Sequence, residues 1–125
     1  MTQILLVGLG GMVGSIGRFL LSGFVQRFSP IVGFPFGTLV VNVIGCFVIG
    51  LLNGVADTRQ LFGNEFRLFL FIGVLGGFTT YSTFGYETLS LLRDAEFHRA
   101  VLSIGLHLIV GLGAVWAGDA LGRLS

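Results

Sequence analysis

Four stretches of mainly apolar residues, joined by short polar segments, constrain this chain more than any other feature. A helix needs about 20 mostly apolar residues to cross the roughly 30 Å of hydrocarbon in a bilayer, because each residue rises about 1.5 Å. We therefore expect membrane spans at about 3–24, 36–56, 66–92 and 98–122. Little remains outside them, so the sequence predicts a single all-α transmembrane domain over residues 1–125.

Composition excludes a water-soluble fold. Hydrophobic residues make up 54% of the chain and charged residues only 10%, whereas a soluble domain typically carries about 25% charged residues. The expected surroundings are a lipid bilayer. No enzymatic activity and no nucleic-acid partner are expected. Glycine pairs four residues apart predict close helix contacts; they are Gly10 and Gly14, Gly50 and Gly54, Gly73 and Gly77, and Gly118 and Gly122.

The cationic residues do not favour one side of the membrane. All seven are arginines. With the N-terminus in the cytoplasm, the inner ends of the spans would hold Arg59, Arg67 and Arg123, and the outer ends Arg27, Arg93 and Arg99. Orientation normally follows an excess of basic residues on the cytoplasmic side. Either another signal sets the topology, or the protein inserts both ways up and two inverted copies pair as an antiparallel homodimer.

Three spans carry polar side chains at membrane depth, where such groups usually face other helices or a cavity. Asn42 in the second span either bonds to a neighbouring helix or lines a pathway. In the fourth span, Ser103 and His107 share a face, and His107 is a proton relay or, with no acidic neighbour in sequence, a neutral hydrogen-bonding group. Arg18, near one end of the first span, either reaches the headgroups or attracts anions at a pore mouth.

The third span contains GGFTTYSTFGYE, residues 76–87, close to its centre. Glycine lowers helix propensity by about 1 kcal/mol, and β-branched threonine is also a poor helix former. Non-helical backbone at this depth must be buried in protein or line a cavity. A break would free carbonyls that can hold a cation and N–H groups that can hold an anion. The alternative is a continuous helix in which hydroxyls bond back to preceding carbonyls.

Tyr81 and Phe84 lie three residues apart and share one face of any helix after the break. Aromatic ring edges are electropositive and can attract an anion weakly. Together with hydroxyl and amide donors on three spans, they indicate weak contact with a small anion at several sites. Ordinary aromatic packing is the alternative.

GGFTTYSTFGYET, together with GTLVVNVIG in the second span and GSIGR in the first, resembles the Fluc/CrcB family of small bacterial fluoride channels. The likeness covers nearly the whole chain. It implies four transmembrane helices with the third broken near the midplane, assembled as an antiparallel dual-topology homodimer with two pores. It also implies passive export of fluoride from the cytoplasm through the bacterial inner membrane.

The resemblance also assigns residues. The carbonyls of Gly76 and Thr79 from both subunits would hold a structural sodium ion that is not transported. The pore would be lined by Asn42, Tyr81, Ser82, Thr83, Phe84, Ser103, His107 and Glu87, with Arg18 in the vestibule. Tyr81 stands where the family usually has phenylalanine, which adds a hydroxyl that could hold the ion or narrow its path.

Two other functions remain open at this stage. A small multidrug-type proton-coupled exporter is also a four-helix dual-topology dimer, and it needs a membrane carboxylate, for which Glu87 is the candidate. A scaffold subunit that transports nothing would use all these polar groups only to bond helices together.

Overall fold

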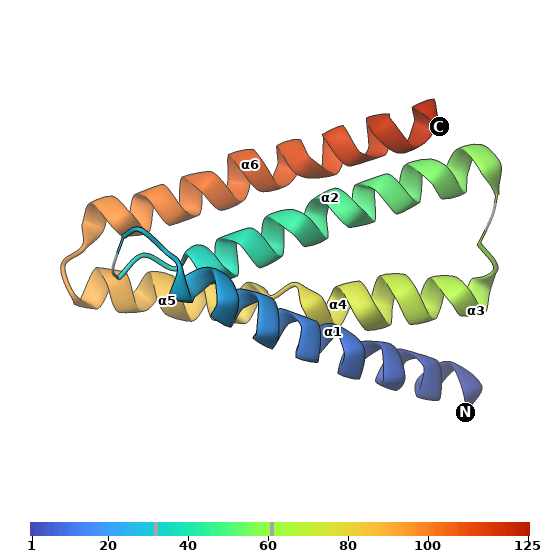
Figure 1. Ribbon diagram of the computed structural model, residues 1–125, viewed down its shortest axis with the longest axis horizontal. Coiled ribbons are helices and arrows are strands. Elements are labelled where there is room, and N and C mark those ends of the chain that lie inside the picture. The colour runs from blue at the N-terminus through green and yellow to red at the C-terminus, as the bar shows by residue number, and fades with distance from the viewer. Residues whose placement is uncertain (32, 61) are drawn as a thin grey trace.

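In the computed structural model, residues 1–31, 33–60 and 62–125 are described, and this part of the chain is helical with no β-strand (Figure 1). Its elements are α1 (Thr2–Arg27), α2 (Phe36–Arg59), α3 (Asn64–Arg67), η1 (Leu68–Leu75), α4 (Gly76–Phe78), α5 (Tyr81–Arg93) and α6 (Phe97–Leu124). Within it, four segments are long and apolar enough to cross a membrane, namely Thr2–Arg27, Phe36–Arg59, Asn64–Arg93 and Phe97–Leu124. This confirms the predicted all-α fold with four spans.

The helices run up and down along one long axis. Both termini and the connection from α2 to α3 lie at one end of the molecule, whereas the other two connections lie at the opposite end (Figure 1). The α2 and α6 helices pack against each other along their lengths, and α1 packs along η1 and α4. The helix α3 continues through the wider turns of the π-helix η1 into α4, because the backbone stays right-handed at Leu68 and Gly76.

Glycine makes both close helix pairs possible. A Cβ atom on Gly73 would lie 2.9 Å from the Cα atom of Gly10, and one on Gly77 would lie 2.7 Å from the carbonyl oxygen of Gly11. In the second pair, α2 presents Gly50 and Gly54, and α6 presents Gly118 and Gly122, each against the backbone of the opposite helix. Small residues let membrane helices approach this closely. The prediction from the glycine pairs is confirmed.

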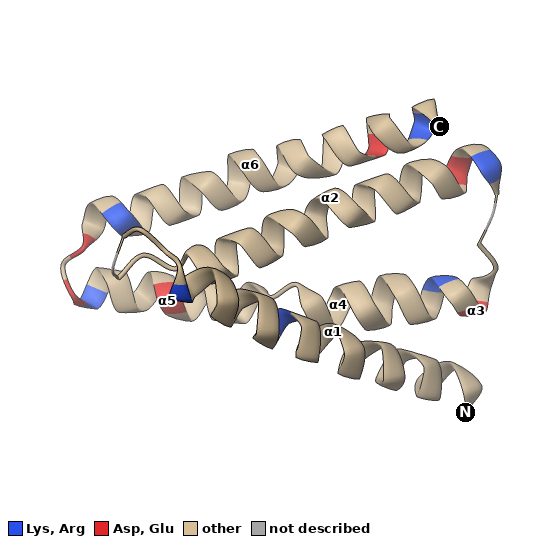
Figure 2. Cartoon of the chain, viewed as in Figure 1, with Lys and Arg blue, Asp and Glu red and all other residues tan. Residues whose placement is uncertain are grey.

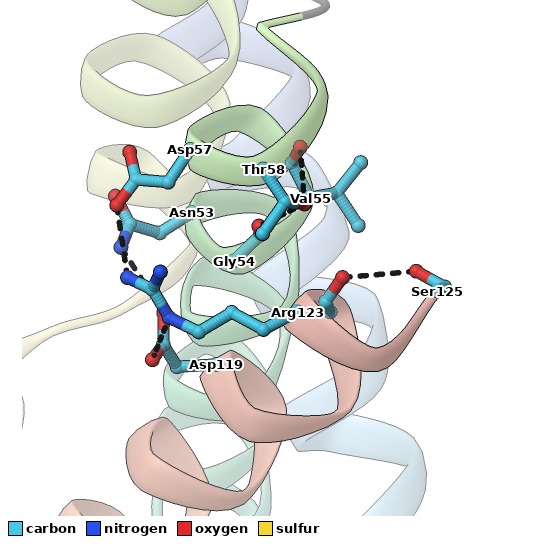
Figure 3. A network of polar contacts seen from close by, with 9 residues as sticks. Asn53, Gly54, Val55, Asp57, Thr58, Asp119, Arg123 and Ser125 are labelled. Carbon is cyan, nitrogen blue, oxygen red and sulfur yellow. Dashed lines mark hydrogen bonds and ion pairs between the residues drawn. The ribbon is translucent and has the colours of Figure 1, made fainter.

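Charged residues gather mainly toward the two ends of the molecule (Figure 2). At the end with the termini, Arg123 donates from Nε to Asp119 at 2.8 Å and from a terminal nitrogen to Asp57 at 3.0 Å. Asn53 donates to the other oxygen of Asp119 at 3.2 Å (Figure 3). These contacts join the ends of α2 and α6. The Asn53 side chain is therefore engaged in a bond between helices.

Candidate functional site

Thr79 and Thr80 separate α4 from α5 and have extended backbone, with φ −84° and ψ 156° at Thr79 and φ −151° and ψ 121° at Thr80. Two glycines precede them, so the α4 segment has low helix propensity. Thr80 is a good start for the next helix, because its hydroxyl accepts a hydrogen bond from the N–H of Thr83 at 3.2 Å. The hydroxyl of Thr79 bonds back to the carbonyl of Leu75 at 3.0 Å.

This geometry removes the usual donors from two carbonyl groups. In a continuous α-helix the carbonyl of Gly76 would accept from the N–H of Thr80, and that of Thr79 from the N–H of Thr83. Instead, Thr80 N–H donates to Asn42 Oδ1 at 2.8 Å, and Thr83 N–H donates to the hydroxyl of Thr80. The carbonyl oxygens of Gly76 and Thr79 have therefore lost their helical partners and are available to a cation.

Asn42 connects this segment to α6. Its amide nitrogen donates to the carbonyl of Thr80 at 3.0 Å and lies 3.1 Å from Nε2 of His107. Because Asn42 Oδ1 accepts a backbone N–H, its nitrogen must face His107. Nε2 of His107 is then the acceptor, and Nδ1 carries the proton that it donates to the carbonyl of Ser103 at 3.0 Å. This network requires a neutral imidazole, which is one of the two roles weighed for His107.

A groove of about 740 Å³ opens along α2, the interrupted third span and α6. Of the predicted site residues it brings together Asn42, Gly76, Thr79, Tyr81, Phe84 and His107. The Phe84 ring is close to both the His107 and the Tyr81 ring, with centroid distances of 4.2 Å and 5.7 Å. Tyr81 is 83% exposed on the single chain. The groove therefore combines aromatic rings with polar backbone and side-chain groups.

Five predicted site residues do not line this groove, namely Ser82, Thr83, Ser103, Glu87 and Arg18. Ser82 is exposed, with its hydroxyl 3.5 Å from that of Thr80. Thr83 accepts from the hydroxyl of Thr80 at 3.1 Å, so it belongs to the start of α5. The side chain of Ser103 is buried, and its backbone carbonyl orients His107. Thr80 is the central residue that sequence reasoning left without a role. Threonine is one of the residues that favour the N-cap position before a helix, and this preference is the signal that could have identified it.

Glu87 lies apart from the groove, next to a smaller cavity of about 300 Å³ that Gln26, Ser90 and Asp94 also line. The Thr38 hydroxyl is within hydrogen-bonding reach of its carboxylate. Among the described residues, nothing bonds to its buried Oε1 atom. Glu87 therefore belongs to one end of the bundle and not to the large groove.

Arg18 makes a contact that neither sequence interpretation included. Its Nε donates to the carbonyl of Gly77 at 3.0 Å, across 59 residues of sequence. In an unbroken helix this carbonyl would accept from the N–H of Tyr81. A cation near the C-terminal end of a helix is favourable because the end carries partial negative charge. Arg18 thus stabilises the end of α4 from the neighbouring helix α1.

We expect Arg18→Met to lower the melting temperature of the purified protein in detergent, because it leaves the Gly77 carbonyl without its charged donor. The expected cost is about 1–3 kcal/mol of unfolding free energy. Arg27→Met, at the end of the same helix, is the matched control and should change the melting temperature little. Equal melting temperatures for Arg18→Met and wild type would contradict a role of this bond in stability.

Comparison with known proteins gives a match over nearly the full chain. The family model described as CrcB-like protein, Camphor Resistance (CrcB), matches residues 5–119. A fluoride-specific ion channel FluC of Methylobacillus flagellatus is 46% identical over 100% of this chain and 98% of its own length. The FluC channel of Geobacter sulfurreducens is 48% identical over 94% of each chain. FluC 1 of Methanosarcina acetivorans is 42% identical over 94% of this chain and 88% of its own length.

Proposed function

Because this chain belongs to the CrcB-like protein family, we propose that it is a channel through which fluoride crosses the membrane passively. Its four candidate spans and its family make it a multi-pass membrane protein. One observation carries the proposal: relatives that are 41–48% identical over at least 94% of this chain are named fluoride-specific ion channels. We place it in the bacterial inner membrane, where passive conduction down the gradient would lower cytoplasmic fluoride.

The groove supports this proposal chemically. A channel must replace the water around an ion with several weak contacts, so that the ion can enter and also leave. The ring edges of Tyr81 and Phe84 offer such contacts without a fixed positive charge. Asn42 and His107 lie in the same groove. Ser82, Thr83 and the buried Ser103 are close in sequence to these groups but outside the groove lining. Glu87 lines the smaller cavity, and Arg18 bonds to the Gly77 carbonyl beside the break.

We further propose that a structural sodium ion binds to the carbonyls of Gly76 and Thr79 from two copies of the chain. The support is that both carbonyls have lost their helical donors to Asn42 and Thr80. Oxygen ligands suit a hard cation. When bound, the sodium ion would offset the partial negative charges of four carbonyls that meet at one point, and it would not be transported.

The second copy is proposed to be inverted, which gives an antiparallel dual-topology homodimer. Non-helical backbone at membrane depth has to be covered by protein or line a cavity, yet Thr79 and Thr80 line an open groove in the single chain. An inverted copy would cover this groove. The arginines are also balanced between the two ends of the spans, so no charge bias opposes insertion both ways up.

The position of Glu87 weighs against a proton-coupled exporter. Such a protein needs a carboxylate in the cavity that receives its substrate, because the proton and the substrate exchange there. The large groove is lined by other residues, and Glu87 lies at the smaller cavity instead. Among the described residues, those that line the large groove include no carboxylate.

Fluoride efflux from liposomes tests the proposal against the exporter. The vesicles contain purified protein and potassium fluoride, valinomycin carries the counter-ion, and a proton ionophore collapses any pH gradient. We expect fluoride efflux to continue at an unchanged rate under these conditions. Glu87→Gln should show the same lack of dependence on the pH gradient, because no proton exchange at Glu87 drives the efflux. Efflux that stops when the pH gradient is removed would favour the exporter.

The sodium proposal predicts that replacing sodium with N-methylglucamine throughout purification lowers the melting temperature and the efflux rate. Removal of the cation leaves the partly negative carbonyl oxygens facing one another. Re-addition of sodium should restore both values, and potassium at the same ionic strength is the control. Equal melting temperatures with and without sodium would contradict a site at Gly76 and Thr79.

A further inference from the structure

We propose that Gln26 is a positioning residue whose side chain, at the end of α1, caps the N-terminus of α2, the helix that forms one wall of the groove. Its amide oxygen accepts from the N–H of Gly37 at 3.0 Å, and its amide nitrogen donates to the carbonyl of Phe34 at 2.9 Å. Both bonds cross the connection between the two helices. Only the effect on transport rests on the proposed channel function.

The N-terminus of α2 needs a cap from elsewhere in the chain. Good capping residues are Ser, Thr, Asp and Asn, because their side-chain oxygen accepts from the N–H of the second or third helical residue. The residue at this position before α2 is Pro35, which has no side-chain oxygen. Gly37 is the second residue of α2 and is buried, so its N–H needs an acceptor within the protein. Gln26, itself at the surface, supplies that acceptor.

The second bond of Gln26 holds the turn that leads into α2. Pro35 has φ −81° and ψ 65°, which are the angles of an inverse γ-turn. In this turn the N–H of Phe36 donates to the carbonyl of Phe34 at 2.9 Å, so this carbonyl accepts one bond from Phe36 and one from Gln26. The side chain of Phe34 is fully buried. Gln26 therefore binds a turn whose shape the proline and a buried aromatic ring already determine.

Close packing of α1 against α2 places Gln26 over this turn. A Cβ atom on Gly37 would overlap the carbonyl oxygen of Ser22 and lie 3.2 Å from its Cα atom. Ser22 and Gln26 are four residues apart and share one face of α1. The glycine at position 37 therefore lets the last turns of α1 reach the first turn of α2, and Gln26 completes the contact with its two hydrogen bonds.

The cap lies close to the groove along α2. Four residues of this helix line the groove, namely Asn42, Gly45, Cys46 and Ile49. Asn42 follows Gly37 by five residues, which is little more than one helical turn. Helix ends without a partner for their N–H groups fray first. By keeping the first turn of α2 helical and fixed to α1, Gln26 sets the direction in which this wall of the groove begins.

Hydrogen exchange of the Gly37 amide tests the cap, with NMR of the full chain in lipid nanodiscs. Gln26→Met keeps the length of the side chain and removes both bonds, so we expect Gly37 to exchange faster by about tenfold or more. Gln3→Met, at the exposed opposite end of α1, is the matched control and should leave Gly37 unchanged. Equal exchange of Gly37 in wild type and Gln26→Met would overturn the cap.

A second variant covers the case in which Gln26→Met does not fold. Gln26→Glu keeps an acceptor for the Gly37 N–H and loses the donor to Phe34. Its negative charge is also favourable at the N-terminus of a helix. We expect Gly37 to exchange as slowly as in wild type, whereas the carbonyl resonance of Phe34 shifts. Fast exchange of Gly37 in Gln26→Glu would contradict the cap.

Fluoride efflux from liposomes distinguishes a positioning role from a local anchor of the turn. Gln26→Met should slow the initial efflux per protein by about threefold or more, which is within the range for mutations in packed networks that touch no ligand. Pro35→Ser added to this variant gives α2 a local cap. It should restore slow exchange at Gly37 and most of the efflux, whereas Pro35→Ala added in the same way should restore neither.

Two results would overturn the positioning role. One is fast exchange of Gly37 in Gln26→Met together with efflux at the wild-type rate. The other is equally slow efflux with Pro35→Ser and with Pro35→Ala, because the lost cap would then not be the cause. Absence of efflux in the wild type would instead remove the channel function, while the exchange of Gly37 would still decide whether Gln26 caps α2.

Discussion

Phe84→Ala is expected to slow fluoride efflux by about tenfold or more, which corresponds to about 1.4 kcal/mol in the barrier to permeation. The Phe84 ring is close to the His107 and Tyr81 rings in the groove, with centroid distances of 4.2 Å and 5.7 Å. Alanine would remove the ring edge from this site. It would also leave room for water next to the ion. The ion would then contact mobile water in place of a fixed aromatic ring. The measurement is the initial efflux rate per protein from liposomes.

A phenylalanine on the outer surface provides the control for this variant. Phe19 on α1 is 75% exposed, so Phe19→Ala removes the same volume away from the groove and should leave efflux nearly unchanged. Both variants should elute from size-exclusion chromatography at the wild-type volume. Equal efflux from Phe84→Ala and wild type would place the ion path elsewhere in the molecule.

Among glycine-to-alanine substitutions on α1, Gly14→Ala is expected to cause the largest decrease in the free energy of unfolding. A Cβ atom at this position would overlap the carbonyl oxygen of Val74 and lie 2.8 Å from the amide nitrogen of Phe78. Both atoms are backbone, so neither can turn aside as a side chain could. Overpacking of this kind typically costs about 1–3 kcal/mol, and here it would push α1 away from the end of α4.

Gly8→Ala is the matched control, on the same helix. A Cβ atom there meets nothing within 4 Å, and alanine favours a helix over glycine by about 1 kcal/mol. The two variants should therefore shift the melting temperature in detergent in opposite directions, down for Gly14→Ala and up or unchanged for Gly8→Ala. A Gly14→Ala protein as stable as wild type would mean that α1 and the third span are not packed as described.

The sequence predicts those parts of the fold that the surrounding lipid bilayer determines, above all the four spans. In lipid a chain has to satisfy its backbone within each helix, so the length of each apolar stretch is enough to place the four spans. The glycine pairs were predictable for a similar reason, because a helix surface without side chains favours close packing. These features depend on the local sequence and on the bilayer alone.

The bonds at the site depend on how helices distant in sequence come together, and a single sequence does not contain that information. The contact of Arg18 with Gly77 crosses 59 residues and that of Asn42 with Thr80 crosses 38. The start of α5 also sets which side chains face the groove. Since α5 begins at Tyr81, the groove receives Tyr81 and Phe84, and Ser82 and Thr83 point elsewhere. Residue spacing alone does not show which face of α5 is turned toward the groove.

Selective fluoride efflux from proteoliposomes tests the central claim most directly. Matched vesicles are loaded with potassium fluoride or potassium chloride, valinomycin starts the efflux, and ion-selective electrodes follow each anion. A fluoride channel predicts fast release of fluoride and release of chloride close to that of protein-free vesicles. Fluoride release at the rate of protein-free vesicles, or equal release of both anions, would contradict it.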